Sequence, residues 1–240
     1  MSVNYLLITV LIAMLIGVVK GYRRGFLRLA VWLLGLIGVI IIVTKTSPAL
    51  SETLMEKTNL YETVRGKIVN IYNEQAKDKI SELQSEEENK VTDQISGAPD
   101  SAVESLGLPE IIAADIIKSC AGEMYQKLAA TLFEEYISVY LAKLVIKAGS
   151  FVGLFVLLGI LMCILLAAVK VIEKIPVLKT FNRILGVGAG LSISLILIWV
   201  FFLAIMMLFG NSLGSWLITQ VQGSKILAYL FNNNILFKFI

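Results

Sequence analysis

Four long stretches of the chain are uncharged and mostly apolar, and short basic segments separate them in pairs. The first pair covers Met1–Val19 and Leu29–Thr44, and the second covers Ala148–Val169 and the run that begins at Ile184. A helix needs about 20 apolar residues to cross the hydrocarbon core of a bilayer. Leu29–Thr44 is shorter, so we expect the cations at its ends to extend it by reaching the interfaces, where Trp32 also fits. The pattern predicts an all-α polytopic membrane protein with four transmembrane helices in two hairpins.

We predict four regions along the chain. The first hairpin covers 1–45, with spans at about 3–20 and 27–45, and an acidic helical extracytoplasmic segment follows at 46–137. The second hairpin covers 138–211, with spans at about 147–170 and 184–210, and a C-terminal apolar or interfacial segment completes the chain at 212–240.

The first apolar run has a second interpretation, as a signal peptide. A signal peptide places positive charge before its apolar core and small residues at a cleavage site after it. Here the order is reversed, because no charge precedes Lys20 and the cations follow the run. We therefore expect a retained, uncleaved span.

The central segment has a helical pattern. Apolar residues recur at steps of three and four from Tyr61 to Leu83, which places them on one face of a helix. A polar stretch follows as far as Ser105. Leu106-Gly-Leu-Pro109 then predicts the start of another ordered segment, because proline suits the first position of a helix. From about Gln126 we expect a helix to run directly into the third span. No stretch alternates as a β-strand would.

The fourth apolar run carries no charge until Lys225, which is more than one helix can use. Gly210-Asn211-Ser212 is therefore the expected exit from the last span. The remaining residues are predicted to form one or two short apolar segments, broken at Asn232-Asn233-Asn234. We expect them to lie along the membrane surface or to pack on the acidic central segment.

Charge is divided unevenly along the chain. The part from Lys45 to Glu135 holds 17 acidic and nine basic residues, a net charge of −8, whereas the rest holds 12 basic residues and one acidic residue, a net charge of +11. The cations of the two short turns are Lys20, Arg23, Arg24 and Arg28, and Lys170, Lys174, Lys179 and Arg183. Short loops rich in lysine and arginine stay cytoplasmic. We therefore predict that both termini and residues 46–137 lie outside the cytoplasm.

The composition of the chain excludes several classes of function. The 240 residues are 57% hydrophobic and 16% charged, as in membrane proteins. Histidine is absent, which removes the commonest general base and metal ligand, and Cys120 and Cys163 do not indicate a disulfide framework. No span holds an ionisable residue away from its ends, which counts against a proton-coupled pump or a voltage sensor. We predict no enzymatic activity, cofactor or metal, and no nucleic-acid binding, because the cations lie in separate juxtamembrane turns.

Small residues recur at four-residue spacing in three of the four spans. These residues are Gly17, Gly21 and Gly25; Gly149 and Gly153; and Gly186, Gly190 and Ser194. Glycine is also simply common in membrane helices, but this spacing puts small residues on one helix face, where backbones can approach closely. We expect tight helix packing, within the bundle or between copies.

The basic turns have two interpretations. Membrane topology alone is sufficient to explain their cations. The functional alternative is a cytoplasmic surface that binds anionic lipid or an acidic partner, at about 1 kcal/mol per cation near the membrane. The acidic run Glu86–Glu88 is likewise either a solvated face or part of a docking surface.

Two stretches resemble the colicin V production protein (CvpA) family of bacterial inner-membrane proteins. One is Gly-Tyr-Arg-Arg-Gly-Phe at 21–26, and the other is Ile175-Pro176 followed by Phe181-Asn182-Arg183-Ile-Leu-Gly186 and a glycine-rich span. The Ser224-Lys225 region is similar to the family's closing segment, and Leu106-Gly-Leu-Pro109 to its longer members with a central insertion. Asn4 stands near the place where the family's first span often has an Asp. The family-motif and packing residues that we predict are Gly17, Gly21, Arg23, Arg24, Gly25, Pro176, Asn182, Arg183, Gly186 and Gly190.

The resemblance implies a role in toxin production or export and in envelope homeostasis, without a molecular activity. Our first hypothesis is a non-enzymatic inner-membrane component that acts through the bilayer, an envelope protein partner or further copies of itself. A small oligomeric transporter or channel subunit is the second, with a polar path at Ser192 and Ser194 for an uncharged solute. A membrane anchor with a sensing or recruiting domain is the third.

Overall fold

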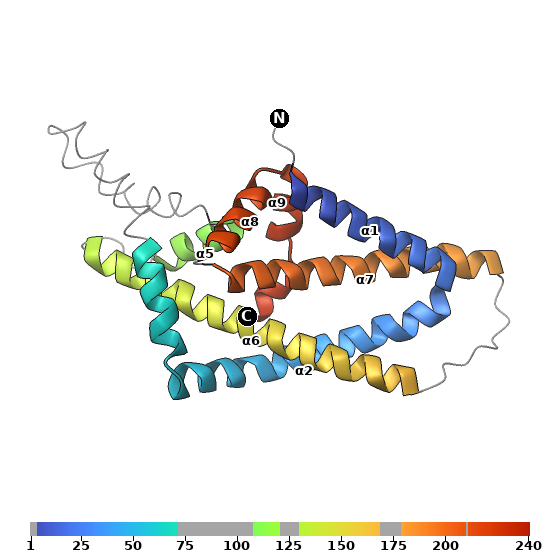
Figure 1. The fold of residues 1–240 in the computed structure, drawn as a ribbon, viewed down its shortest axis with the longest axis horizontal. Helices are drawn as coiled ribbons and strands as arrows, with labels where there is room; N and C mark the ends of the chain where they lie inside the picture. The colour runs from blue at the N-terminus through green and yellow to red at the C-terminus, as the bar shows by residue number, and fades with distance from the viewer. Residues whose placement is uncertain (1–3, 72–107, 121–129, 169–178, 210) are drawn as a thin grey trace. The chain divides into compact units, whose positions relative to one another are not determined.

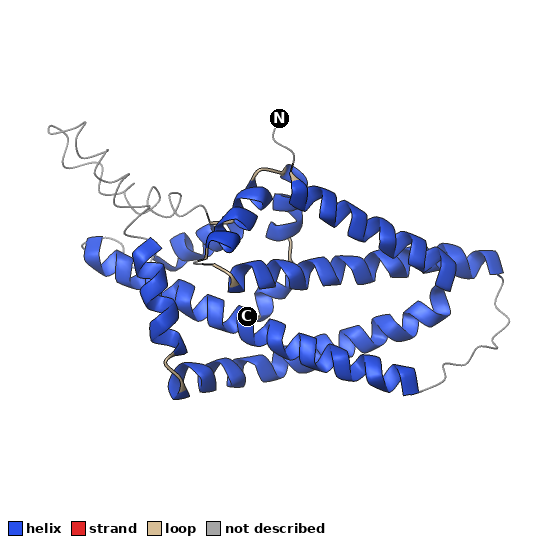
Figure 2. Ribbon diagram, in the orientation of Figure 1, coloured by secondary structure: helices blue, strands red, loops and turns tan. Residues whose placement is uncertain are grey.

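The computed structural model describes residues 4–71, 108–120, 130–168, 179–209 and 211–240. Every regular element within these ranges is helical, and none of them contains a strand (Figure 2). Four helices are long and apolar enough to cross a membrane: Tyr5–Arg24, Phe26–Lys57, Glu135–Leu166 and Thr180–Met207. The prediction of an all-α membrane protein with four spanning helices is confirmed.

The first two spans, α1 (Tyr5–Arg24) and α2 (Phe26–Lys57), are joined by the single residue Gly25. Asn4 caps α1, because its side-chain oxygen accepts a hydrogen bond of 2.9 Å from the N–H of Leu7. Gly25 has φ +77° and ψ 163°, a backbone conformation that only glycine adopts at low cost. Its N–H donates to the carbonyl of Gly21 at 3.0 Å, so α1 ends and α2 begins without a loop.

The other two spans are α6 (Ala130–Ala168) and α7 (Lys179–Met207). α6 continues without a break from the end of the central segment into the third span, as the sequence predicts. α7 ends at Met207 and α8 (Ser212–Gln222) begins after Asn211, so the predicted exit lies between these two helices (Figure 1).

The chain divides into two compact units. The first, which we call the membrane unit, comprises residues 1–52, 147–204 and 234–240. The second, which we call the acidic unit, comprises residues 53–146 and 205–233. The predicted boundaries at 45, 137 and 211 stay predictions.

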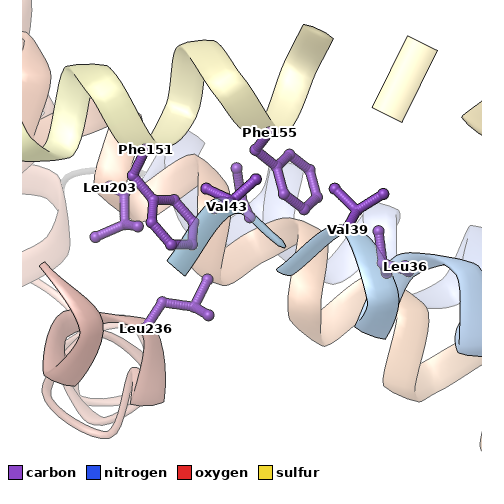
Figure 3. Close-up of a cluster of buried hydrophobic side chains, with 8 residues drawn as sticks. Leu36, Val39, Val43, Phe151, Phe155, Leu203 and Leu236 are labelled. Carbon is purple, nitrogen blue, oxygen red and sulfur yellow. The ribbon is translucent and has the colours of Figure 1, made fainter. Parts of the chain in front are cut away.

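The core of the membrane unit joins three spans and the C-terminal residues. Figure 3 shows α2 and α6 contributing side chains that face one another, with Leu203 of α7 and Leu236 beside them. The buried members of this core are Leu36, Val39, Val43, Phe151, Phe155, Val200, Leu203 and Leu236. Such interdigitated contacts hold helices together in lipid, where dispersion replaces the hydrophobic effect as the driving force.

The outward surfaces of the same helices are apolar as well. Leu15, Leu34, Leu157 and Ile164 are each more than 60% exposed, although each is a large aliphatic residue. A soluble protein rarely exposes extended apolar surface of this kind. Lipid is therefore the surrounding that suits these faces.

The acidic unit contains part of the predicted central helix. Residues 60–71 are helical, whereas the remainder of the predicted helix to Leu83, together with Glu86–Glu88, lies outside the described residues. α5 (Glu110–Cys120) begins one residue after Pro109, whose carbonyl accepts from the N–H groups of Ile112 and Ala113 at 2.9 and 3.0 Å. The proline thus precedes the helix instead of occupying its first position.

The C-terminal residues are shared between the two units. α9 (Lys225–Asn232) packs on the central segment, because the Asn232 side chain accepts from the N–H of Ile111 at 3.4 Å and donates to Glu110 at 3.0 Å. This agrees with one of the two predicted placements. The 3-10 helix η1 (Ile235–Phe239) departs from both, since it belongs to the membrane unit and buries Leu236 in its core.

Candidate functional site

The predicted glycine residues of α1 and α7 lie against one another. A Cβ atom built at Gly21 would come within 3.0 Å of the carbonyl oxygen of Gly186, and one at Gly190 would do the same to the carbonyl oxygen of Gly17. Real Cβ atoms essentially never come this close to another heavy atom. The two helices therefore meet backbone to backbone, and only glycine fits at these positions. We call this contact the glycine junction.

Ser194 continues the glycine junction by one turn. Its hydroxyl donates to the carbonyl of Gly190 at 3.0 Å and lies 3.5 Å from the carbonyl of Ala13 on α1. The serine is 8% exposed. The hydroxyl is thus satisfied by its own helix and also faces the neighbouring backbone, as small polar residues do in membrane helix contacts.

The same spacing in α6 has a different outcome. A Cβ atom at Gly153 would meet nothing within 4 Å, so this glycine does not require close packing. Close packing within the bundle is therefore not found at Gly153, and packing of this face between copies stays a prediction. Spacing places residues on one face, but a partner helix must also cover that face.

Asn182 closes the end of the junction. Gly25 has no side chain to cap α2, and the Asn182 side-chain oxygen accepts from the N–H of Leu27, in the first turn of α2, at 3.1 Å. An N-cap residue normally makes this bond from the position just before its own helix. Here an asparagine 155 residues further along the chain supplies it. Gly25 packs directly against the same side chain.

Three of the predicted arginine residues lie near this end of the junction. Arg23 and Arg24 are exposed in the last turn of α1, where cations suit the negative end of the helix dipole. The guanidinium of Arg183 lies 5.5 Å from the ring centroid of Tyr22, a cation–π contact between α7 and α1. Pro176 lies outside the described residues.

These contacts place the C-terminal end of α1 beside the N-terminal end of α7. Gly25 marks the turn of the first hairpin, and Asn182 lies four residues into α7, just after the second turn. Helices α1 and α7 therefore run antiparallel from this end. Arg23 and Arg24 of the first turn and Arg183 at the start of α7 therefore lie at one end of the membrane unit.

A cavity of about 550 Å³, which we call the α1 groove, lies beside the glycine junction. Ile16 and Leu197 are 47% and 49% exposed, so the groove opens on the outside of the membrane unit. Its walls are almost entirely apolar, and Lys20 and Arg24 are the charged residues among them. The lining residues are Thr9, Val10, Ala13, Ile16, Gly17, Lys20, Arg24, Leu29, Trp32, Gly190, Ile193, Ser194, Leu197, Ile198 and Phe201.

Sequence patterns place the α1 wall of this groove but not the groove itself. Thr9, Ala13, Lys20 and Arg24 recur at steps that share one helix face, which the spacing alone shows. The opposite wall depends on how α7 crosses α1, and that is decided by the backbone contact at the junction. Across the described ranges, no three His, Cys, Asp or Glu residues gather as a metal site.

Comparison with known families accounts for the second half of the chain. Residues 114–234, just over half of the 240, match the family described as Colicin V production protein. The chain belongs to the colicin V production protein family. Searches of the curated proteins and of the solved structures found no match.

The colicin V production match includes most of the second hairpin's predicted motif. Pro176, Asn182, Arg183, Gly186 and Gly190 all lie within the matched residues. The resemblance at 21–26 lies outside them and stays a prediction. The glycine junction thus joins a helix inside the colicin V production match to a helix outside it.

Proposed function

We propose that this protein is a non-enzymatic inner-membrane component that supports toxin production or export, or envelope homeostasis, through other proteins or lipid. The proposal rests on the contacts that the polar and small residues of the membrane unit make. Asn182, Ser194 and the paired glycines serve helix capping and helix contact. They hold the spans together instead of forming a reaction centre.

The charges of the membrane unit support the same proposal. Among its described residues the one acidic side chain is that of Glu52, at the edge of the unit. Proton-coupled transport and acid–base catalysis both need ionisable groups held within the site. A scaffolding role needs none.

Membership of the colicin V production family supplies the biological setting of the proposal. Production of the toxin can be measured in a host whose own member of this family has been removed. We expect the wild-type chain to restore production, and Gly21→Leu to fail because it separates α1 from α7. Gly153→Leu is the matched control, since nothing lies within 4 Å of a Cβ there. Restoration by Gly21→Leu at wild-type levels would contradict the proposal that the junction supports the role.

An oligomeric transporter or channel is the second proposal, and it predicts solute flux through reconstituted protein. The hydroxyls of Ser192 and Ser194 both donate to carbonyls one turn earlier in α7, at 3.1 and 3.0 Å. Under this proposal the polar path through these residues lies between copies of the chain. Monomeric protein that passes no solute would eliminate this alternative, and crosslinking in the native membrane with identification of partners would support the first.

The third hypothesis, an anchor for a sensing or recruiting domain, concerns the acidic unit. It predicts that the full chain binds an envelope component and that charge reversal of exposed acidic residues weakens this binding. Glu62, which is exposed in the described part, is one such residue. Unchanged binding after reversal would favour the membrane unit as the functional part.

A further inference from the structure

We propose that the α1 groove binds an anionic phospholipid, with one acyl chain along its apolar length and the phosphate at Lys20 and Arg24. The groove combines an apolar channel with positive charge at one end. That arrangement matches the division of a phospholipid into an anionic head and an apolar chain. The site goes beyond general attraction of the basic turns to a membrane surface, because it requires a specific cavity.

The dimensions of the groove fit one chain. From Thr9 to Arg24 the lining follows α1 for about 22 Å, at a rise of about 1.5 Å per residue. One leaflet contributes about 15 Å of hydrocarbon, which is half of a core of about 30 Å. An acyl chain that begins beside Arg24 can therefore stay in the groove through the depth of its leaflet.

Charge argues against a membrane helix of a second copy as the occupant. Such a helix would have to place an anionic group beside Lys20 and Arg24, and among the described residues of the membrane unit the one acidic side chain is Glu52. A phospholipid carries its phosphate at the end of its acyl chains and so matches both parts of the groove.

The charged end has the chemistry that a phosphate needs. Lys20 and Arg24 are four residues apart on α1, both are exposed, and both line the groove. In the part of the chain that the structure describes, neither of them has a carboxylate partner. Arginine and lysine donate charge-assisted hydrogen bonds to phosphate oxygens. Arg23 is also exposed in the same turn but does not line the groove.

Trp32 provides a direct probe because it lines the groove. The full chain with Trp199→Phe and Trp216→Phe keeps Trp32 as its one tryptophan. Both replacements are mild, since Trp216 is exposed and the indole nitrogen of Trp199 has no partner among the described atoms. The protein is reconstituted in vesicles that contain brominated phosphatidylglycerol or brominated phosphatidylcholine, each at increasing mole fractions over the same range. Bromine quenches tryptophan on contact, so the quenching reports which lipid occupies the groove.

We expect phosphatidylglycerol to quench Trp32 at a lower mole fraction than phosphatidylcholine. Each cation should contribute about a fivefold preference, the factor that corresponds to about 1 kcal/mol. Lys20→Gln and Arg24→Gln should each reduce the preference by that factor, and Arg23→Gln should leave it unchanged. Ala13→Phe should lower quenching by both lipids, because its ring enters the apolar part of the groove.

Three results would overturn the proposal. Equal quenching by the two lipids would show that the groove has no anionic selectivity. A loss in Arg23→Gln as large as that in Arg24→Gln would assign the preference to general surface charge. Shielding of Trp32 from both lipids that increases with the protein-to-lipid ratio would identify a second copy as the occupant. Circular dichroism confirms the fold of each variant, and the three cation variants test the proposal even if Ala13→Phe does not fold.

Discussion

Asn182 shows how a side chain of one helix can cap another. It belongs to α7, yet its side-chain oxygen caps the first turn of α2. Asn232 repeats the arrangement in the acidic unit, where it caps α5 at Ile111 from α9. In both places the residue before the capped helix, Gly25 or Pro109, has no side-chain acceptor of its own. A distant asparagine supplies what the local sequence lacks.

Removing the cap at the junction should destabilise the protein moderately. We expect Asn182→Ala to lower the free energy of unfolding by about 1 kcal/mol, because the N–H of Leu27 loses its acceptor. Asn182→Asp keeps an acceptor of similar capping strength and should remain near wild type. Thermal unfolding in detergent micelles measures both variants. An aspartate variant as unstable as the alanine variant would show that the amide group, and not the cap, is what matters.

The glycine junction makes a second prediction at the scale of single residues. Gly21→Ala forces a Cβ atom against the backbone of Gly186, and overpacking of this kind costs about 1–3 kcal/mol. Gly153→Ala adds the same atom in open space and should be neutral or stabilising by up to about 1 kcal/mol, since alanine favours a helix. Unfolding of the two variants under identical conditions tests the difference. Equal destabilisation would mean that the close approach of α1 and α7 does not limit stability.

At the scale of elements, the 3-10 helix η1 fastens the C-terminal residues to the membrane unit. The Asn234 side chain donates to the carbonyl of Trp199 at 3.0 Å and accepts from the N–H of Leu236 at 3.0 Å. The Lys147 ammonium donates to the carbonyl of Ile240 at 3.2 Å. Two polar contacts thus flank one buried leucine.

Leu236 should contribute most of the free energy that holds η1 on the membrane unit. Leu236→Ala is expected to cost about 2–5 kcal/mol, because it leaves a cavity beside Val43 and Phe151. Ile235→Ala is the matched control, since Ile235 is 48% exposed and its loss should change stability by less than about 0.5 kcal/mol. Limited proteolysis from the C-terminus, together with thermal unfolding, measures the effect. Similar behaviour of the two variants would contradict a role for Leu236 in the core.

The elements also show which features a sequence can predict. The four spans are predictable because long uncharged runs have few alternatives to a membrane helix. The placement of Ile235–Phe239 is not predictable, because four apolar residues and one lysine fit a membrane surface, a domain face or a core equally well. The glycines at 21 and 153 have the same spacing in the sequence, and only the neighbouring helix distinguishes them. The α1 groove likewise forms where α1, α2 and α7 meet, and the sequence of α1 indicates only one of its walls.

At the scale of the whole molecule, the charge pattern predicts an orientation that labelling can test. In a background with Cys120→Ser and Cys163→Ser, Glu62→Cys should react with a membrane-impermeant thiol reagent on intact cells. Arg23→Cys, in the basic turn, should react only after the membrane is opened. Both positions are exposed, so accessibility within the protein does not limit either reaction. The opposite pattern would reverse the predicted topology.

The cap that Asn182 provides has a consequence for the order of biosynthesis. Asn182 follows Leu27 by 155 positions in the chain. A ribosome adds about 5–20 residues per second, so Asn182 is synthesised about 8–30 s after Leu27. During that interval the start of α2 lacks its final acceptor. Beside a basic turn, water and lipid head groups can accept the hydrogen bond of this N–H, so the delay costs little. Within hydrocarbon the N–H would have no acceptor and the cost would be several kcal/mol. The first hairpin can therefore enter the membrane early and reach its final state only when the second arrives.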